Sequence, residues 1–319
     1  MLPGPAVLLA IFASTAMVSN GAIAQRGRSP RQAPVRITSD TAPTTAASPL
    51  ILTIAPNATV WIDDIRRGVT DSSGKLVLTR ISPGRHTLRV RANGSKEVTM
   101  PLLPGRGSVT VKLVQTTDQA ELLFQQAETA REQAKDDDAR QKAADLYRET
   151  LKLRAAFPAA HVGLARLLLD LNQFEQAHAE IDAARRTRPI YAEASAVEGR
   201  IYREAAFNDE AIRSFRRSIK EGRGFQPEAH VGLARVLEEK GQYAEAIAEY
   251  RKALDQLSDS EPVIYQLLGA AYEKLQKPKE AIVAYEKYLE LAPNGSLAPA
   301  LRSILDQLKR EAAGQEIIP

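Results

Sequence analysis

The amino-acid sequence predicts a multidomain protein in which a small all-β sandwich, residues 49–115, is followed by an all-α solenoid of helical repeats, residues 117–312. The solenoid is predicted by repetition, because the seven residues Ala160–Arg166 recur unchanged as Ala229–Arg235. An alanine late in each repeat recurs at spacings of 34, 35 and 35 residues: Ala177, Ala211, Ala246 and Ala281. The sandwich is predicted by a different period, since apolar residues there fall at every second position between turn-forming residues.

Residues 1–24 resemble a secretory signal peptide. A largely apolar run from Ala6 to Val18 is shorter than the roughly 20 residues needed to span a bilayer. Ala22-Ile23-Ala24 then supplies the small-x-small pattern of a cleavage site. We expect export, with a retained N-terminal anchor as the alternative because no Lys or Arg precedes the apolar run. No later segment is suited to a span, so we expect no integral membrane segment in the mature chain.

Two segments are predicted to lie outside the folded domains. Residues 25–48 are rich in Ser, Thr, Pro, Ala and Arg and contain almost no large apolar residue. Such a composition cannot bury enough surface to order itself, so we expect a disordered linker. Residues 313–319 form a short tail after the last predicted helix.

The segment 49–115 alternates apolar and polar residues, as in Leu50, Leu52 and Ile54. Asn93-Gly94 between two such runs predicts a hairpin, because both residues tolerate positive φ. We therefore expect a small antiparallel sandwich of six or seven strands. Ala58–Asp64 together with Ser82–Gly94 resembles the PEGA domain, although Pro56-Asn57-Ala58 and Asp63-Asp64 replace its usual glycines. The resemblance implies a non-enzymatic surface module of an exported bacterial protein.

The helical repeats resemble tetratricopeptide (TPR) repeats, whose period is about 34 residues. A large residue follows each late alanine by four positions: Ile181, Phe215, Tyr250 and Tyr285. Earlier in each repeat, a small residue precedes a large one by three positions: Ala165 and Leu168, Gly199 and Tyr202, Ala234 and Leu237, Gly269 and Tyr272. Small residues let the two helices of a repeat approach closely, and the large ones fill the space between repeats. We expect an atypical first repeat over residues 119–155 and a closing helix after Ser296.

Charge is distributed unevenly along the chain. Residues 26–116 contain 14 Lys/Arg against 5 Asp/Glu, whereas the rest of the chain carries a net charge of −5. An acidic array repels nucleic acid, so we expect no nucleic-acid partner. The chain contains no cysteine, which excludes disulfides, thiolate metal sites and catalytic thiols.

No catalytic or cofactor-binding motif is present. The chain lacks G-x-S-x-G, the phosphate-binding G-x-x-x-x-G-K-[ST] and H-E-x-x-H. Its four histidines, His86, His161, His178 and His230, have no spacing typical of zinc ligands. We therefore expect neither an enzyme nor a bound metal or cofactor; a hydrolase of unrecognised type is a third alternative that only a substrate screen would detect.

A row of arginines is the main candidate site. The ninth residue of three successive repeats is Arg166, Arg200 and Arg235. The TPR resemblance implies that this position points into a concave groove, where guanidinium groups bind carboxylates or phosphates bidentately. Each arginine also has an acid four residues on, so a salt-bridged surface of mixed charge is the alternative. Those acids are Asp170, Glu204 and Glu239, and further acids that face or border the groove are Glu193, Glu228, Glu238 and Glu273.

Two further features bear on the partner. Val162, Ala196 and Val231 occupy positions where the carboxylate clamp of some TPR domains has lysine, so a chaperone C-terminal tail is a poor candidate ligand. Trp61, the only tryptophan, either packs under a neighbouring loop or forms an exposed platform for surface contact.

These observations predict an exported, non-catalytic adaptor of the bacterial envelope, periplasmic or secreted, that binds a protein or peptide in the groove of the repeats. The alternative is that the basic PEGA-like domain binds cell wall or another anionic glycan while the repeats act as a spacer.

Overall fold

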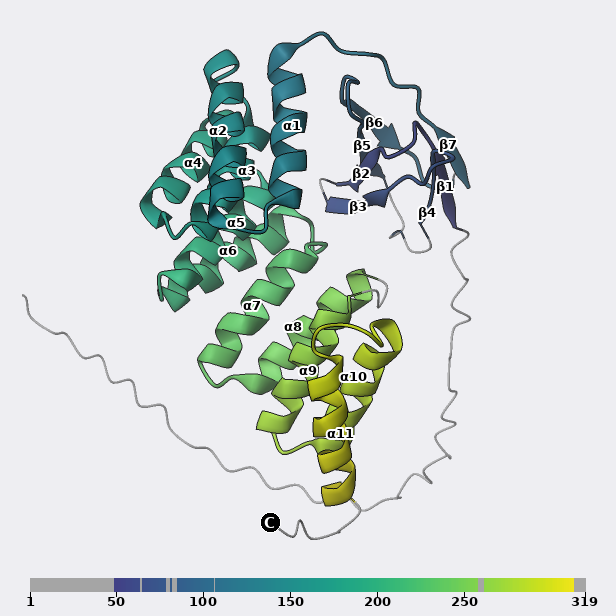
Figure 1. Ribbon diagram of the computed structural model, residues 1–319, viewed down its shortest axis with the longest axis vertical. Coiled ribbons are helices and arrows are strands. Elements are labelled where there is room, and N and C mark those ends of the chain that lie inside the picture. The colour runs from purple at the N-terminus through teal and green to yellow at the C-terminus, as the bar shows by residue number, and fades with distance from the viewer. Residues whose placement is uncertain are drawn as a thin grey trace, which may run out of the picture. The chain divides into compact units, whose positions relative to one another are not determined.

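The protein, seen in a computed structural model, combines two β-sheets with a run of paired helices (Figure 1). The structure describes residues 49–63, 65–78, 81, 85–105, 107–257 and 261–312. All of them belong to one of the two units into which the chain divides, Ala47–Pro319. The predicted signal peptide, the linker 25–48 and the tail 313–319 lie outside the described residues.

In the part of the chain that the structure describes, seven strands form two sheets that enclose a common core, which confirms the predicted sandwich. They are β1 (Leu50–Thr53), β2 (Thr59–Ile62), β3 (Ile65–Val69), β4 (Lys75–Leu78), β5 (His86–Arg91), β6 (Val98–Leu102) and β7 (Ser108–Thr110). One sheet has the order β4-β1-β7 and the other β3-β2-β5-β6. The expectation of a purely antiparallel fold is wrong at one place, because β7 pairs with β1 in parallel.

The period-two pattern decides which side chains enter the sandwich core. Leu52 of one sheet and Val60, Leu88 and Val90 of the other have no exposed surface and belong to one hydrophobic cluster. The alternate residues of β2 and β5 point to the opposite face of their sheet, because successive side chains along a strand point to opposite sides. That opposite face carries Trp61 and two arginines, which are described with the candidate site.

Eleven helices follow the sandwich within the described part of the chain, in five pairs and a closing helix. They are α1 (Gln119–Gln133), α2 (Asp137–Leu153), α3 (Pro158–Asp170), α4 (Phe174–Thr187), α5 (Ala192–Glu204), α6 (Asn208–Glu221), α7 (Pro227–Glu239), α8 (Tyr243–Gln256), α9 (Pro262–Lys274), α10 (Pro278–Leu291) and α11 (Ala298–Ala312). They form the predicted solenoid, and the longer α2 makes the first pair atypical.

The boundaries of the helices follow from local backbone chemistry. Pro158, Pro227 and Pro262 are the first residues of α3, α7 and α9, where a missing amide donor costs no intrahelical bond. Inside the four pairs from α3 to α10, the turn contains one residue with positive φ: Asn172, Ala206, Gly241 and Gln276. These residues are spaced by 34, 35 and 35 positions, so the turn repeats with the helices.

Glycine allows the helices of a repeat to pack closely, as the sequence pattern predicts. A methyl group at Gly199 would lie 2.7 Å from the ring of Phe215, and one at Gly269 would lie 2.4 Å from the ring of Tyr285. Gly232 is in similar contact with Phe215 of the preceding repeat, at 2.3 Å. Atoms this close overlap, so a glycine at these three positions is required by the aromatic side chains that pack against it.

The interior of the solenoid consists of two hydrophobic clusters that meet at α5. The first contains Phe124, Tyr147 and the residues Ala194, Val197 and Ile201 of α5. The second contains Ala196 of the same helix and continues to Leu308 of α11. Helix α5 therefore contributes to both clusters, with different residues in each.

Candidate functional site

One side of the solenoid lines a cavity of about 770 Å³, formed by side chains of α1, α3, α5 and α7 together with residues of β2, β3 and β5. Among the described residues, eight arginines line it: Arg66, Arg89, Arg91, Arg131, Arg166, Arg200, Arg203 and Arg235. Six glutamates line it as well: Glu128, Glu132, Glu193, Glu204, Glu228 and Glu261. We call this space the arginine cavity. All three arginines of the predicted row lie in its wall.

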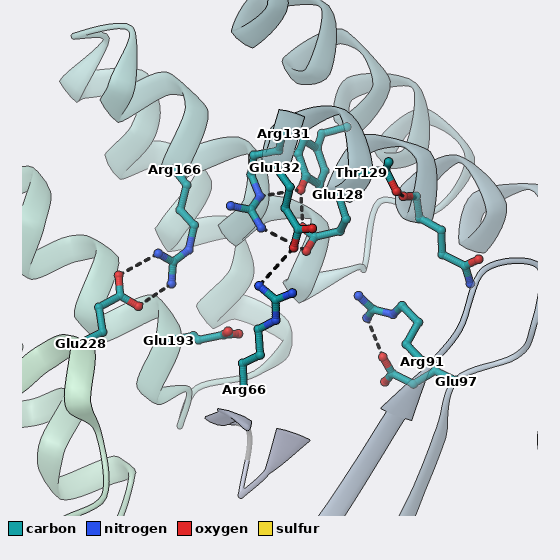
Figure 2. A network of polar contacts seen from close by, with 12 residues as sticks. Arg66, Arg91, Glu97, Glu128, Thr129, Arg131, Glu132, Arg166, Glu193 and Glu228 are labelled. Atoms are coloured by element: carbon teal, nitrogen blue, oxygen red, sulfur yellow. Dashed lines mark hydrogen bonds and ion pairs between the residues drawn. The ribbon is translucent and has the colours of Figure 1, made fainter. Parts of the chain in front are cut away.

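Arg166 and Glu228 form a bidentate ion pair at the centre of this wall. Nη1 and Nη2 of Arg166 donate hydrogen bonds to Oε1 and Oε2 of Glu228 over 2.7 and 2.8 Å (Figure 2). Burial by itself would raise the pKa of Glu228, but the charge and hydrogen bonds of Arg166, with a contribution from Arg200, lower it to about 2. The pair therefore stays ionised at neutral pH and joins α3 to α7 across an intervening helix pair.

The expected ion pairs between each arginine and the acid four residues on are wrong for this row. Arg166 bonds Glu228 rather than Asp170, and Arg200 donates to Asp170 over 3.3 Å rather than to Glu204. Arg200 also lies 3.9 Å from a Glu228 oxygen. The physical reason is stacking: an acid on the neighbouring pair, or on the pair beyond it, lies within reach of the row, so it competes with the acid on the same helix.

The other two predicted acids, Glu204 and Glu239, pair with Arg203, which is not part of the predicted row. Arg203 donates to Glu204, and its Nε lies 3.9 Å from Glu239. Arg203 follows Arg200 by three residues, so one helical turn places it beside the row; that spacing is the signal by which it could have been found. Arg235 makes no ion pair within 4 Å with any described residue, and its side chain is exposed.

A cluster on α1 and α2, with Tyr147 buried and Glu128 and Arg131 half-buried, borders the same cavity. The hydroxyl of Tyr147 donates to Glu128, and Arg131 donates to that hydroxyl over 3.3 Å. Arg131 also donates to Glu128 over 3.3 Å (Figure 2). Burial and the nearby carboxylate raise the pKa of Tyr147 well above its ordinary value. Burial favours neutral Glu128, but Arg131 and the tyrosine hydrogen bond outweigh it and lower the pKa of Glu128. These three groups satisfy one another.

Trp61 is packed rather than exposed, so the predicted surface platform is wrong, and the residue packs against arginine side chains of β5 rather than under a loop. It retains 7% of its surface and lies under the guanidinium groups of Arg89 and Arg91, 4.3 and 5.2 Å from the ring centroid. The guanidinium of Arg91 also lies over the ring of Phe124 on α1, 4.3 Å from its centroid. Arg91 also pairs with Glu97 at 2.5 Å (Figure 2). The outer face of the sheet is thus an aromatic and cationic layer beside α1.

Further contacts join the sandwich to the helical part of the chain around the cavity. Arg66 of β3 lies 3.3 Å from Glu132 of α1 (Figure 2). The backbone amide of Gly94 donates to Gln125 over 2.8 Å, and the guanidinium of Arg67 lies 4.5 Å from the ring centroid of Phe225. The groove predicted for the repeats is therefore walled in part by the sheet, through Arg66, Arg89 and Arg91.

Two histidines of the repeats share one arrangement away from the cavity. Nδ1 of His161 lies 2.6 Å from Glu180 and its Nε2 lies 2.9 Å from the carbonyl oxygen of Ala155. His230 has the same partners one copy later, Glu249 at 2.5 Å and the carbonyl of Gly224 at 3.3 Å. Each ring nitrogen of His161 faces an acceptor, which favours the doubly protonated ring. Burial opposes this charge, but the two hydrogen bonds outweigh it and raise the pKa of His161.

The described residues contain neither a metal-binding cluster nor a membrane-spanning helix. No group of three or more His, Cys, Asp or Glu residues there is arranged to hold a metal ion. No helix among them has the length and apolar character needed to cross a membrane.

Comparison with known proteins identifies the repeats. Two family profiles described as tetratricopeptide repeat match the chain, one over residues 134–201 and the other over residues 225–294. No curated protein sequence matches it. The chain therefore carries TPR repeats, as the sequence pattern predicts, and the profiles fall on the helical part.

Solved structures share the fold of the helical part. The APC/C hetero-tetramer Cut9–Hcn1 matches with a TM-score of 0.52 and 15% identity, over 59% of this chain and 36% of that one. The thermophilic TPR protein TTC0263 of Thermus thermophilus matches with a TM-score of 0.50 and 20% identity, over 60% and 98%. The protein pilF of Pseudomonas aeruginosa matches with a TM-score of 0.52 and 15% identity, over 61% and 86%. At these identities the likeness concerns the fold alone, and the match spans only about a third of the Cut9–Hcn1 chain.

Proposed function

We propose that this chain is an exported, non-catalytic adaptor of the bacterial envelope that binds a partner polypeptide in the arginine cavity. The observation that supports binding most directly is the cavity itself, about 770 Å³ in volume and lined by the first helices of successive TPR repeats. Stacked repeats create extended concave surfaces of this kind, and binding is their common use. The mixture of arginine, glutamate and apolar side chains in the wall suits a peptide better than a purely apolar ligand.

The proposal of export and an envelope location rests on sequence features. Residues 1–24 have the apolar run and cleavage pattern of a signal peptide, and the sandwich resembles the PEGA domain of exported bacterial proteins. Both features point to the same compartment. The proposal that the chain is not an enzyme rests on the missing catalytic motifs described above.

Binding of an anionic cell-wall polymer by the sandwich is less favoured by the charge distribution. Arg89 and Arg91 are each only 8% exposed, and both lie within 4 Å of Glu97. Arg91 additionally lies 3.6 Å from Glu121 of α1. Both arginines of the basic domain therefore already have a carboxylate partner, and Arg91 also contacts α1, so a polymer at the surface gains little from them.

The adaptor function is tested by capturing the partner from the cavity. A photoreactive benzophenone amino acid is placed at Thr129, an exposed residue in the cavity wall whose hydroxyl bonds only its own helix, at the carbonyl of Gln125. The matched control carries it at Arg213 of α6, which is 68% exposed and outside the wall. Irradiation in native cells, followed by mass spectrometry, should yield a protein adduct from Thr129 alone. No adduct from Thr129, or the same adduct from both positions, would refute the proposal.

A further inference from the structure

The arginine cavity contains one ion pair that shows what its other arginines are suited to bind. Arg166 grips both oxygens of Glu228, and these residues are 62 positions apart in the sequence. Glu228 is the second residue of α7, and Arg166 is the ninth of α3, two helix pairs earlier. In this pair, an acid in the second position of a helix reaches the arginine in the ninth position of the helix two pairs before it.

At the positions equivalent to Glu228, the next two arginines of the row have no acid. Two pairs after Arg200, the second position of α9 is Val263. For Arg235, the position equivalent to Glu228 is found by applying the 69-residue shift between the identical copies to Glu228, which gives Leu297. Both replacements are apolar and cannot accept a hydrogen bond.

These two arginines also have fewer or longer contacts with carboxylates than Arg166 has. Arg200 is 31% exposed and has one hydrogen bond from Nη2 to Asp170 at 3.3 Å, with a Glu228 oxygen further off at 3.9 Å. Arg235, in the second copy of the seven-residue sequence, has no ion pair with a described residue, whereas its counterpart Arg166 has two short hydrogen bonds. The same local sequence therefore carries a guanidinium with two short hydrogen bonds to a carboxylate in one copy. In the other copy the guanidinium lies near Glu238 and Tyr250 but has no carboxylate within 4 Å among the described residues.

Most arginines of the wall already have a carboxylate partner. Acids outside the lining also pair with them, as Glu97 and Glu121 do with Arg91 and Asp170 does with Arg200. Among the described residues, Arg235 is the lining arginine without a carboxylate within 4 Å, so an acidic ligand beside it is favoured and a basic one is not. The basic segment 25–48 is a poor occupant for that reason.

We propose that the arginine cavity takes an acidic segment of a partner protein, whose carboxylates are bound by Arg200 and Arg235 as Arg166 binds Glu228. This inference rests on the proposed adaptor function and names the chemistry of its partner. Planar guanidinium groups bind carboxylates with two parallel hydrogen bonds, which gives both charge and geometric selectivity. The Arg166–Glu228 pair is not part of the ligand site; it holds the wall in place beside it.

The test uses the full chain and a short fluorescein-labelled peptide in which glutamate alternates with glycine. A second peptide has glutamine in place of glutamate, so that it keeps the shape and loses the charge. Binding is measured by fluorescence anisotropy with the wild type, with Arg200→Gln/Arg235→Gln, and with the control Arg148→Gln/Arg213→Gln. The control removes the same charge from two exposed arginines on α2 and α6 that pair with acids three residues away.

We expect the glutamate peptide to bind the wild type and the control alike, and the cavity variant at least about tenfold more weakly. The glutamine peptide should bind all three proteins weakly. Equal affinity for both peptides, or an equal loss in the control, would overturn the inference. Displacement of the peptide by inorganic tripolyphosphate at equal charge concentration would also overturn it, because the cavity would then be a general anion site.

Failure of this inference is separable from failure of the adaptor function. If the Thr129 photo-crosslink captures a partner whose affinity does not change in Arg200→Gln/Arg235→Gln, the adaptor function stands and the acidic segment is wrong. If Thr129 captures nothing, the adaptor function itself fails.

Discussion

The ion pair between Arg166 and Glu228 gives a quantitative prediction about stability. The substitution Glu228→Gln keeps the size of the side chain and removes its charge. The pKa of this carboxyl falls from its ordinary value of 4.5 to about 2 in the folded chain. At 1.36 kcal/mol per pKa unit, that shift corresponds to about 3 kcal/mol of stabilisation by the ionised form. The carboxylate is 34% exposed, so solvent screens part of this energy. We expect the variant to lose about 1–2 kcal/mol of unfolding free energy at pH 7.

The pH dependence of this loss has a defined sign. A carboxyl whose pKa is lowered by folding stabilises the folded chain fully above its unfolded pKa, near 4.5, and loses that contribution as the pH falls through about 2. The difference between wild type and Glu228→Gln should therefore be constant from pH 7 to about 5 and fall to roughly half by pH 3. Urea unfolding followed by helical circular dichroism measures it.

A matched variant separates this effect from a general loss of charge. Glu210→Gln removes a carboxylate from α6 that is 39% exposed and pairs with Arg213 three residues on, at 2.7 Å. Exposed pairs of this kind contribute less than about 1 kcal/mol, so this variant should lose about 0.5 kcal/mol at most. Equal losses for the two variants, or a loss for Glu228→Gln that does not change between pH 7 and pH 3, would refute the reasoning.

Three further outcomes are expected. Gly269→Ala should cost about 1 kcal/mol in urea unfolding, because a methyl group 2.4 Å from the buried ring of Tyr285 outweighs the helix propensity of alanine; a stabilised variant would contradict the packing argument. The pKa of His161, followed by NMR of the ring protons, should lie above 6.5 since Glu180 and a backbone carbonyl accept from it. The stabilisation it provides should be complete below pH 6.5 and fade as the pH rises through the raised pKa, which an unfolding series in pH would detect. Asp118→Ala should cost about 1 kcal/mol, because this side chain accepts the first amide hydrogens of α1; no change in the unfolding midpoint would argue against the cap.

The local parts of the fold could be predicted from the sequence because they depend on near neighbours. A recurring alanine and the spacing of Gly199 and Gly269 before aromatic residues reflect contacts within one repeat, so the period alone predicts paired helices. The alternation of Leu50, Leu52 and Ile54 likewise reflects the two faces of one strand. Each of these patterns involves residues that are close in the sequence and in space.

The details of the site could not be predicted in the same way, because they depend on contacts between distant segments. The partner of Arg166 is 62 residues away, and only the stacking of α3, α5 and α7 brings Glu228 to it. The expectation that Arg166 pairs with the acid four residues on, Asp170, considers one helix in isolation. The burial of Trp61 depends on contacts at the sheet face beside α1, and the alternation of residues along a strand does not predict such contacts.

The division of the solenoid interior at α5 has a mechanical consequence. In a stack where each helix pair touches mainly its neighbours, bending concentrates where two separate cores adjoin. The array is therefore expected to hinge at α5, between the cluster that ends with Ile201 and the cluster that begins with Ala196. The Arg166–Glu228 ion pair joins α3 on one side of this hinge to α7 on the other. It therefore limits how far the helices before α5 and those after it can move apart.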